Sequence, residues 1–317
     1  MNLIDKKIKV GPKKSFVENL LVIEGITRSG KFLLANILSG LEEIEPSQYS
    51  GLLEQIPFLA SFGLIEKQTA KQLIRCEVDM RCYEMLIGRN LNYRLSDKSS
   101  IYKIPNYKKL VARSRNSNIE DMISQFKKEK PYSPFILHES MSLIEIYFET
   151  FPKMKCISIQ RNPIDLAYSW YKRGLGRRWG EDPLLLQIPF MKENYKGKFP
   201  WFAIGWEDLY LNLDEANRAV LSVKALIEKA QESYTQLTKE TKKQILVIRY
   251  ENLVSNSKGE IENLSNFLGK KTSPEMKKIL TQEDLPKIGQ AAKKKEKLKE
   301  MKAVVNKEYL DELLRLS

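Results

Sequence analysis

The sequence is poor in cysteine, has a single histidine and lacks a long apolar run, and each scarcity excludes a class of protein. Its 317 residues include three cysteines, which form no C-x-x-C pair and leave one over from any pairing. We therefore expect neither a disulfide framework nor a zinc site, and predict a reduced, cytoplasmic protein. No run approaches about 18 apolar residues, so a membrane span is not expected either. Residues 1–15 carry lysines but no apolar stretch, which argues against a secretory leader.

Positive charge is what the sequence has in excess. The 53 Lys and Arg residues against 40 Asp and Glu residues give a formal net charge of +13. Such an excess favours polyanionic partners, namely nucleic acids, acidic glycans, membrane surfaces or phosphate-rich nucleotides. Residues 287–302 hold seven lysines against two glutamates, and we expect this stretch to be mainly a solvated helix surface. Charge alone does not identify the ligand.

Short apolar runs alternate with helical patterns along the chain. Strands are expected at 19–24, 135–138, 156–159 and 244–249, and the helices that follow them at 31–38, 140–148, 163–172 and 257–268. This alternation predicts an α/β fold, a P-loop-type parallel sheet of about four to five strands flanked by helices, with helical insertions.

Helical insertions are expected outside these strand–helix units. Two or three helices are expected within 51–89, broken near Gly63 and Asp79, and further helices at 212–237 and 291–316, whereas 90–118 and 174–205 are expected to be irregular. No linker-like segment divides the chain. We therefore expect one domain over 1–317, with its core at about 19–268 and a basic helical C-terminal segment at 287–317.

A glycine-rich loop lies between the first expected strand and the first expected helix. In this context backbone N–H groups and a helix N-terminus bind an anion. The loop, Gly25-Ile-Thr-Arg-Ser-Gly30-Lys31, matches the start of the Walker A pattern G-x-x-x-x-G-K. The next residue, Phe32, cannot hold Mg²⁺ as the usual Ser or Thr does, so no metal is expected. A P-loop kinase or ATPase that uses Lys31 is the alternative.

The same loop resembles the 5′-phosphosulfate loop of sulfotransferases that use 3′-phosphoadenosine 5′-phosphosulfate (PAPS). In that family a loop of the form [RK]-[ST]-G-[TS]-[TS] binds the 5′-phosphate without a metal. Arg28, Ser29 and Gly30 match this form, whereas Lys31 and Phe32 replace the two hydroxyl residues. The resemblance implies that all five residues line the phosphate. It also implies that Arg28 contacts the bridging oxygen of the donor and stabilises the leaving phosphate.

Two later segments resemble the same family. Arg161 ends the third expected strand, and Ser169 lies eight residues later on the helix that Asn162-Pro163 opens. The resemblance implies that both side chains reach the 3′-phosphate, a role that suits a guanidinium beside a helix start. Tyr250-Glu-Asn-Leu follows the fourth expected strand and resembles the signature Tyr-Glu-[DN]-Leu, in which the tyrosine lies near the adenine.

Two residues are candidates for the base that removes the acceptor's proton. Glu54 lies 26 positions after Arg28, in a setting similar to that of a glutamate in glycan and protein-tyrosine sulfotransferases. His138, 23 positions before Arg161, resembles the catalytic histidine of the cytosolic sulfotransferases, and Glu139 adjoins it. We rank Glu54 first, because an arginine at position 28 groups the loop with the glycan and protein-tyrosine enzymes. His138 stays the alternative.

All four tryptophans fall within 37 residues, at Trp170, Trp179, Trp201 and Trp206, among several basic residues. Aromatic faces beside cations suit a sugar or an acidic acceptor, although the rings would equally form a small core under a long loop. The sequence thus predicts sulfuryl transfer from PAPS to a hydroxyl, on a carbohydrate, as the activity. A basic nucleic-acid-binding protein is the alternative from another class, but no recognised DNA or RNA module is present, so no nucleic-acid partner is expected.

Overall fold

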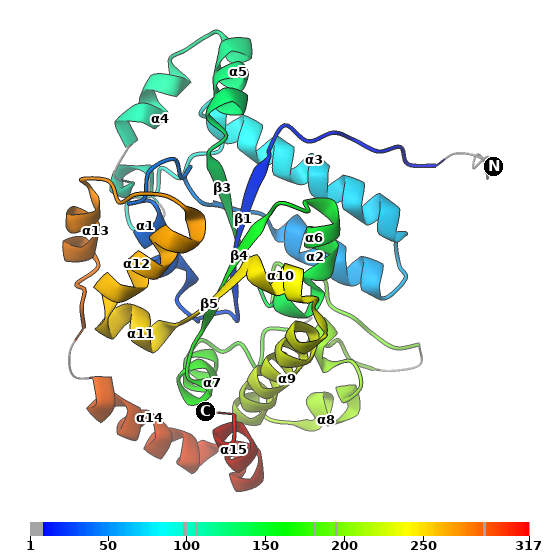
Figure 1. Ribbon diagram of the computed structural model, residues 1–317. Coiled ribbons are helices and arrows are strands. Elements are labelled where there is room, and N and C mark those ends of the chain that lie inside the picture. The colour runs from blue at the N-terminus through cyan, green and yellow to red at the C-terminus, as the bar shows by residue number, and fades with distance from the viewer. Residues whose placement is uncertain are drawn as a thin grey trace.

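A five-stranded parallel sheet forms the centre of the computed structural model (Figure 1). The structure describes residues 9–97, 100–104, 107–179, 182–193, 196–287 and 290–316. The first eight residues of segment 1–15, which was not expected to be a secretory leader, lie outside the described residues. The sheet order is β2-β3-β1-β4-β5, with β1 Asn19–Gly25, β2 Gln48–Tyr49, β3 Tyr132–His138, β4 Lys155–Gln160 and β5 Ile245–Arg249. The predicted parallel α/β fold is confirmed.

The sequences of the strands are apolar runs, because helices cover both faces of the sheet. Successive side chains of a strand point to opposite faces. Val22 and Cys156 therefore enter one apolar core, while Ile23 and Ile157 enter the other. Two-residue β2 escaped the sequence pattern because it is too short to show one.

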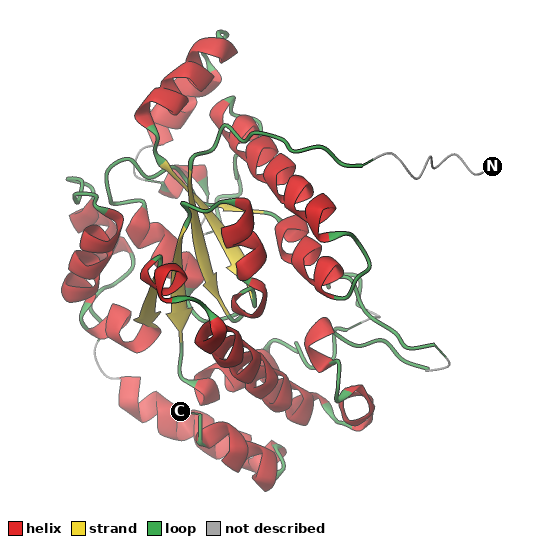
Figure 2. Cartoon of the chain, turned by 45° about the vertical axis from the view of Figure 1, so that its right-hand side comes forward, coloured by secondary structure: helices red, strands yellow, loops and turns green. Residues whose placement is uncertain are grey.

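Helices pack on both faces of the sheet, as Figure 2 shows. One face carries α1 (Lys31–Leu38), α11 (Tyr250–Ser255), α12 (Ser257–Leu268) and α13 (Met276–Gln282). The other face carries α2 (Gly51–Ser61), α3 (Lys67–Leu86), α6 (Glu145–Thr150) and α9 (Glu215–Gln236). The remaining helices are α4 (Tyr107–Ser114), α5 (Ile119–Glu129), α7 (Pro163–Lys172), α8 (Glu207–Asn212), α10 (Lys239–Lys243), α14 (Gln290–Val304) and α15 (Lys307–Leu314), with 3₁₀ turns η1 (Ile101–Lys103), η2 (Met141–Leu143) and η3 (Trp201–Ala203).

Several predicted helix boundaries were wrong. Helix α3 continues through Asp79, because the Asp79 carboxylate is turned to the N-terminal segment and accepts from Lys13, from Ser15 and from the Phe16 amide. The stretch predicted to be irregular at 90–118 contains η1 and α4. The helix expected at 212–237 is one helix, α9, but begins three residues later, because Asp214 accepts from the Asn217 amide and caps it. The helix expected at 291–316 is split, because Asn306 accepts from the Glu308 amide and starts a new helix.

The C-terminal segment lies against α7, below the sheet in Figure 1. Lys297 Nζ is 2.6 Å from Asp165 Oδ1, and Glu300 accepts from Lys172 at 2.7 Å and from the Tyr168 hydroxyl at 3.1 Å. Part of the lysine-rich 287–302 stretch thus packs on the helix that follows β4, and residues 288–289 of it lie outside the described chain. Among the described helices, none has the length and apolarity needed to cross a membrane.

Candidate functional site

The loop between β1 and α1 forms a tight turn at the carboxyl end of the sheet. The Ser29 amide donates to the Ile26 carbonyl at 2.9 Å and closes it. Gly30 has φ +109°, and a Cβ there would lie 2.5 Å from Tyr250 Cδ2, so only glycine fits. Arg28 has φ +78°, a region that non-glycine residues avoid. No described side chain caps α1, so its first amides point out of the helix as free donors.

Arg28, Arg161, Ser169 and Tyr250, which the sequence marked in three separate segments, meet at this loop. Arg28 Nε donates to Ser169 Oγ at 3.0 Å, and Arg161 Nη1 donates to the Arg28 carbonyl at 2.8 Å. The Arg161 guanidinium lies over the Tyr250 ring, with Cζ 4.5 Å from the ring centroid. Arg161 directly follows β4, Ser169 lies on α7, and Tyr250 directly follows β5 as the first residue of α11, so parallel strand ends bring the four together.

This cluster of two arginines has no acidic partner in the part of the chain that the structure describes. Partial burial lowers the pKa of Arg28, and the neighbouring Arg173 and Arg161 lower it further, because like charges disfavour the charged form. Arg161 Nε and the hydroxyl of Ser29 are buried and have no hydrogen-bond partner among the described residues. Uncompensated positive charge and unused donors fit an anionic ligand.

Lys31 lies inside the loop rather than at its surface. Its Nζ donates to the carbonyls of Gly25 at 2.5 Å and Ile26 at 3.0 Å. Burial lowers the pKa of Lys31, and the carboxylates of Glu139, Glu24 and Glu54 oppose that shift. The ammonium group therefore stabilises the loop from within. Phe32 follows it on α1, is 42% exposed and is no metal ligand.

Glu54 and His138, the two candidate bases, form a pair. Glu54 Oε1 lies 2.5 Å from His138 Nδ1 and accepts from the His138 amide at 2.7 Å. The other oxygen, Oε2, accepts from the Tyr49 hydroxyl at 3.3 Å, and the Tyr49 ring packs edge-on against the imidazole with centroids 5.5 Å apart. A carboxylate accepts only, so it holds the proton on Nδ1 and leaves Nε2 as the acceptor nitrogen.

Three further residues hold this geometry through contacts that the sequence did not predict. Glu139 Oε1 accepts from the Thr27 amide at 2.5 Å, and Trp170 Nε1 donates to the Thr27 carbonyl at 2.8 Å, so both groups of one loop residue are fixed. Glu251 accepts from the Asn162 amide at 2.9 Å and thereby ties the Tyr-Glu segment to the turn after Arg161. From the sequence, Glu139 had been named only as the neighbour of His138, Glu251 only as part of the Tyr-Glu segment, and Trp170 only as one of four clustered tryptophans.

The tryptophans divide between core and partly exposed positions. Trp170 and Trp201 are buried in an apolar cluster with Phe58 and Phe202, while Trp179 and Trp206 are partly buried. The expectation that the rings form a small core is confirmed for Trp170 and Trp201. Among the described residues, His, Cys, Asp and Glu side chains form no group of three or more that could hold a metal ion.

Comparison with known proteins places the chain in a family. No curated protein sequence matches the chain significantly. Solved structures similar to it include the sulfotransferase domain from the curacin biosynthetic pathway, with 16% identity over 81% of this chain and 76% of that one, at a TM-score of 0.45. The sulfotransferase domain of the Synechococcus PCC 7002 olefin synthase shows 17% identity over 85% of this chain and 79% of that one, at a TM-score of 0.42.

A third similar structure is mouse sulfotransferase SULT7A1 complexed with PAP, with 14% identity over 83% of this chain and 63% of that one, at a TM-score of 0.36. Residues 19–311 match the family of the sulfotransferase domain. That stretch includes the loop, the arginine cluster and the Glu54–His138 pair. The chain therefore belongs to the sulfotransferase family, enzymes that transfer a sulfuryl group to an acceptor.

Proposed function

We propose that this protein transfers the sulfuryl group of PAPS to a hydroxyl of a carbohydrate acceptor. The observation that carries the proposal is the meeting of Arg28, Arg161, Ser169 and Tyr250 at the β1–α1 loop. A nucleotide with phosphates on both its 3′ and 5′ positions needs two anion sites close together. Two arginines without an acidic partner supply them.

The residues present fit such a donor. The free amides at the start of α1 and the Arg28 guanidinium would hold the 5′ end, with Ser29, Gly30 and Lys31 shaping the loop. Arg161, whose buried Nε has no partner among the described residues, and Ser169 would hold the 3′-phosphate, with the Tyr250 ring beside the nucleoside. The donor supplies an activated sulfuryl group attached to a phosphate that departs, and Arg28 is placed to stabilise the charge on that phosphate.

His138 is the better candidate for the base, with Glu54 as its positioning residue. This reverses the order that the sequence favoured, because both oxygens of Glu54 already accept hydrogen bonds. Nε2 of the imidazole is left to accept the proton of the acceptor hydroxyl, and the Glu54 carboxylate stabilises the imidazolium that results. The Glu139 carboxylate accepts from the Thr27 amide, and because Glu139 is next to His138, this contact fixes the position of the loop relative to the proposed base.

A hollow beside Tyr49 supports a neutral sugar as acceptor. Its volume is about 240 Å³, and Phe32 of α1 and Tyr49 of β2 both line it. Amide side chains of Gln48 and Asn90 contribute donors and acceptors, and none of the described lining residues carries a formal charge at neutral pH. Aromatic faces with amide groups suit the alternating apolar and hydroxyl surfaces of a sugar ring. Tyr49 also packs on His138, so this hollow adjoins the base.

Thermal unfolding with added nucleotides tests the donor assignment. Adenosine 3′,5′-bisphosphate at a hundredfold excess over its dissociation constant should stabilise the protein by about 2.7 kcal/mol. Mg-ATP and a single-stranded oligonucleotide at matched concentration should stabilise it far less. Stabilisation by Mg-ATP alone would favour a kinase or ATPase. Stabilisation by the oligonucleotide alone, lost at higher salt, would favour a nucleic-acid-binding protein.

A further inference from the structure

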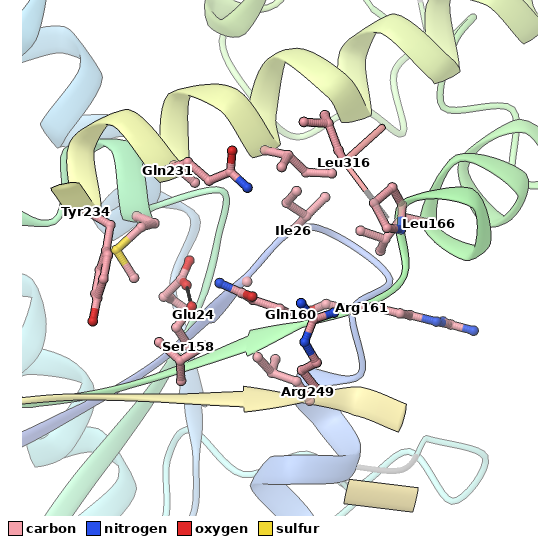
Figure 3. Close-up of a pocket in the computed structure, with 18 residues that line it drawn as sticks. Glu24, Ile26, Ser158, Gln160, Arg161, Leu166, Gln231, Tyr234, Arg249 and Leu316 are labelled. Atoms are coloured by element: carbon pink, nitrogen blue, oxygen red, sulfur yellow. Dashed lines mark hydrogen bonds between the residues drawn. The ribbon is translucent and has the colours of Figure 1, made fainter. Parts of the chain in front are cut away.

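One stretch of the described chain turns most of its large apolar side chains towards water. Leu166 on α7 shows the ordinary arrangement, since it lines an interior cavity beside Arg161 (Figure 3). Residues 184–191, in the loop between α7 and η3, show the reverse arrangement. Four large apolar side chains of this stretch are between 40% and 75% exposed, namely those of Leu184, Leu186, Ile188 and Met191. Exposed apolar side chains that cluster in this way indicate an interaction surface.

The backbone of the 184–191 stretch is fastened to the body of the protein. The Ile188 amide donates to Gln55 Oε1 on α2 at 3.2 Å. Phe190 and Phe199 exchange two backbone hydrogen bonds, at 2.8 and 2.9 Å, and the Phe190 ring packs edge-on against Phe62 with centroids 5.3 Å apart. In Figure 1 the loop that contains the stretch extends to the right of the helices, in light green. The exposed side chains therefore stand on a loop that these contacts hold in place.

Positive charge follows the apolar stretch directly. The stretch itself has no charged side chain, whereas residues 192–198 hold Lys192, Lys196 and Lys198 against Glu193. All three lysine side chains are exposed. A lipid bilayer has the matching order of layers, with acyl chains beneath negatively charged phosphates, and lysine side chains are long enough to reach those phosphates while their neighbours enter the apolar layer.

The charge of the chain argues against a second copy as the occupant of this surface. In a two-fold contact the same surface of both copies meets, so the lysines of one copy would face those of the other. Each copy also has a formal net charge of +13, which makes the copies repel each other. An anionic membrane attracts the same charge, so the apolar contact and the electrostatic attraction act together there.

We propose that the 184–191 stretch docks the protein on an anionic membrane surface. The side chains of Leu184, Leu186 and Met191 enter the acyl layer, and those of Lys196 and Lys198 lie beside the lipid phosphates. Because the stretch is bonded to α2 through Gln55, docking would hold α2 beside the membrane.

Cosedimentation of the full chain with lipid vesicles tests the proposal. Vesicles of phosphatidylcholine and phosphatidylglycerol should bind the protein at low salt, and vesicles of phosphatidylcholine alone should bind it at least about tenfold more weakly. Binding to the anionic vesicles should weaken as the salt concentration rises, because salt screens the attraction. No binding to the anionic vesicles, or equal binding to both kinds, contradicts the proposal.

Matched substitutions locate the docking surface. The double variant with Leu184→Ser and Leu186→Ser should bind anionic vesicles at least about tenfold more weakly, because two side chains lose their contact with acyl chains. Lys196→Gln should weaken binding about fivefold. The control is Leu95→Ser, since Leu95 is 71% exposed, as Leu184 is, and lies outside the stretch; it should bind like the wild type. Unchanged binding by the double variant, or an equal loss in the control, would overturn the assignment.

Sedimentation velocity distinguishes the membrane from a second copy of the chain. Without lipid, the wild type and the double leucine variant should sediment alike, because the stretch does not join copies. A wild-type dimer that the double variant converts to a monomer would show that a second copy covers the stretch, and would contradict the proposal.

Discussion

The two sides of the β1–α1 loop differ in the sign of their charge. Towards β4 and α7, Arg28 and Arg161 approach each other with no acidic partner among the described residues. Towards β3 and α2, Glu54 and Glu139 surround His138 and the loop backbone. In the proposed function, the first side holds the anionic donor and the second accepts the proton of the acceptor. A transfer reaction from an anionic donor to a hydroxyl needs both next to each other.

Consecutive loop residues fix the distance between these sides. The Thr27 amide is bound by Glu139 and the Thr27 carbonyl by Trp170, while the next residue, Arg28, is bound by Ser169. Both sides are therefore fastened to one rigid turn. In this arrangement, a change on one side should leave the other intact, and the predictions below depend on that independence.

The largest effect is expected from His138→Asn. The asparagine amide can still donate to Glu54, but it has no counterpart of Nε2, so kcat should fall about a thousandfold. Affinity for adenosine 3′,5′-bisphosphate should stay within about twofold of the wild-type value, because the arginine side is unchanged. Turnover assays with PAPS and nucleotide titrations measure both. A parallel loss of nucleotide affinity would show that the two sides are not independent.

The next largest effect is on the pH dependence of stability and concerns Glu24, which with Glu54 and Glu139 is one of the carboxylates near Lys31. Burial raises the pKa of Glu24 from 4.5 to about 7, so the folded state holds this proton more tightly than the unfolded state. The resulting stability is present below pH 4.5 and is lost as the pH rises through 7. A rise of this size corresponds to about 3 kcal/mol.

Denaturant unfolding of the wild type and of Glu24→Gln measures this contribution. The wild type should lose about 3 kcal/mol of unfolding free energy relative to the variant between pH 4.5 and pH 8. A difference between the two proteins that does not change with pH would mean that Glu24 is not held in its acid form.

A smaller effect is expected from Glu54→Gln. The neutral amide keeps the shape of the side chain but no longer stabilises a charged imidazole, so kcat should fall about 10- to 30-fold. The KM for the acceptor and the nucleotide affinity should not change, whereas a structural defect at this position would alter both. The exposed Glu42→Gln is the matched control. Full activity in both Glu54→Gln and His138→Asn would mean that neither residue is correctly assigned.

Local patterns in the sequence predicted the fold and marked the residues that meet at the β1–α1 loop. Apolar runs ending at Gly25 and Arg161 mark the carboxyl ends of two adjacent parallel strands, which meet at one edge of the sheet. Asn162-Pro163 marks the start of α7 and so the placement of Ser169. Glycine, proline and strand ends are local signals, and for that reason they could be found without a structure.

The sequence indicated Glu54 and His138 as candidate bases but could not predict that they form a pair, because the pair depends on a contact between distant segments. Glu54 and His138 are 84 positions apart, and no local pattern of either α2 or β3 shows that one carboxylate contacts both the backbone amide and Nδ1 of His138. Burial of Glu24 was equally hidden, because it ends an apolar run in the manner of any strand terminus. The split at Asn306 had a local signal, since asparagine is a good helix N-cap, but the surrounding helical composition concealed it.

Binding calorimetry with two nucleotides tests most directly whether Arg28 and Arg161 hold one doubly phosphorylated ligand. Arg161→Ala should weaken binding of adenosine 3′,5′-bisphosphate about 100-fold while leaving adenosine 5′-monophosphate unaffected, because the latter has no 3′-phosphate. Arg28→Ala should weaken binding of both, and the exposed Arg115→Ala should change neither. Undiminished binding of the bisphosphate by Arg161→Ala would contradict the account.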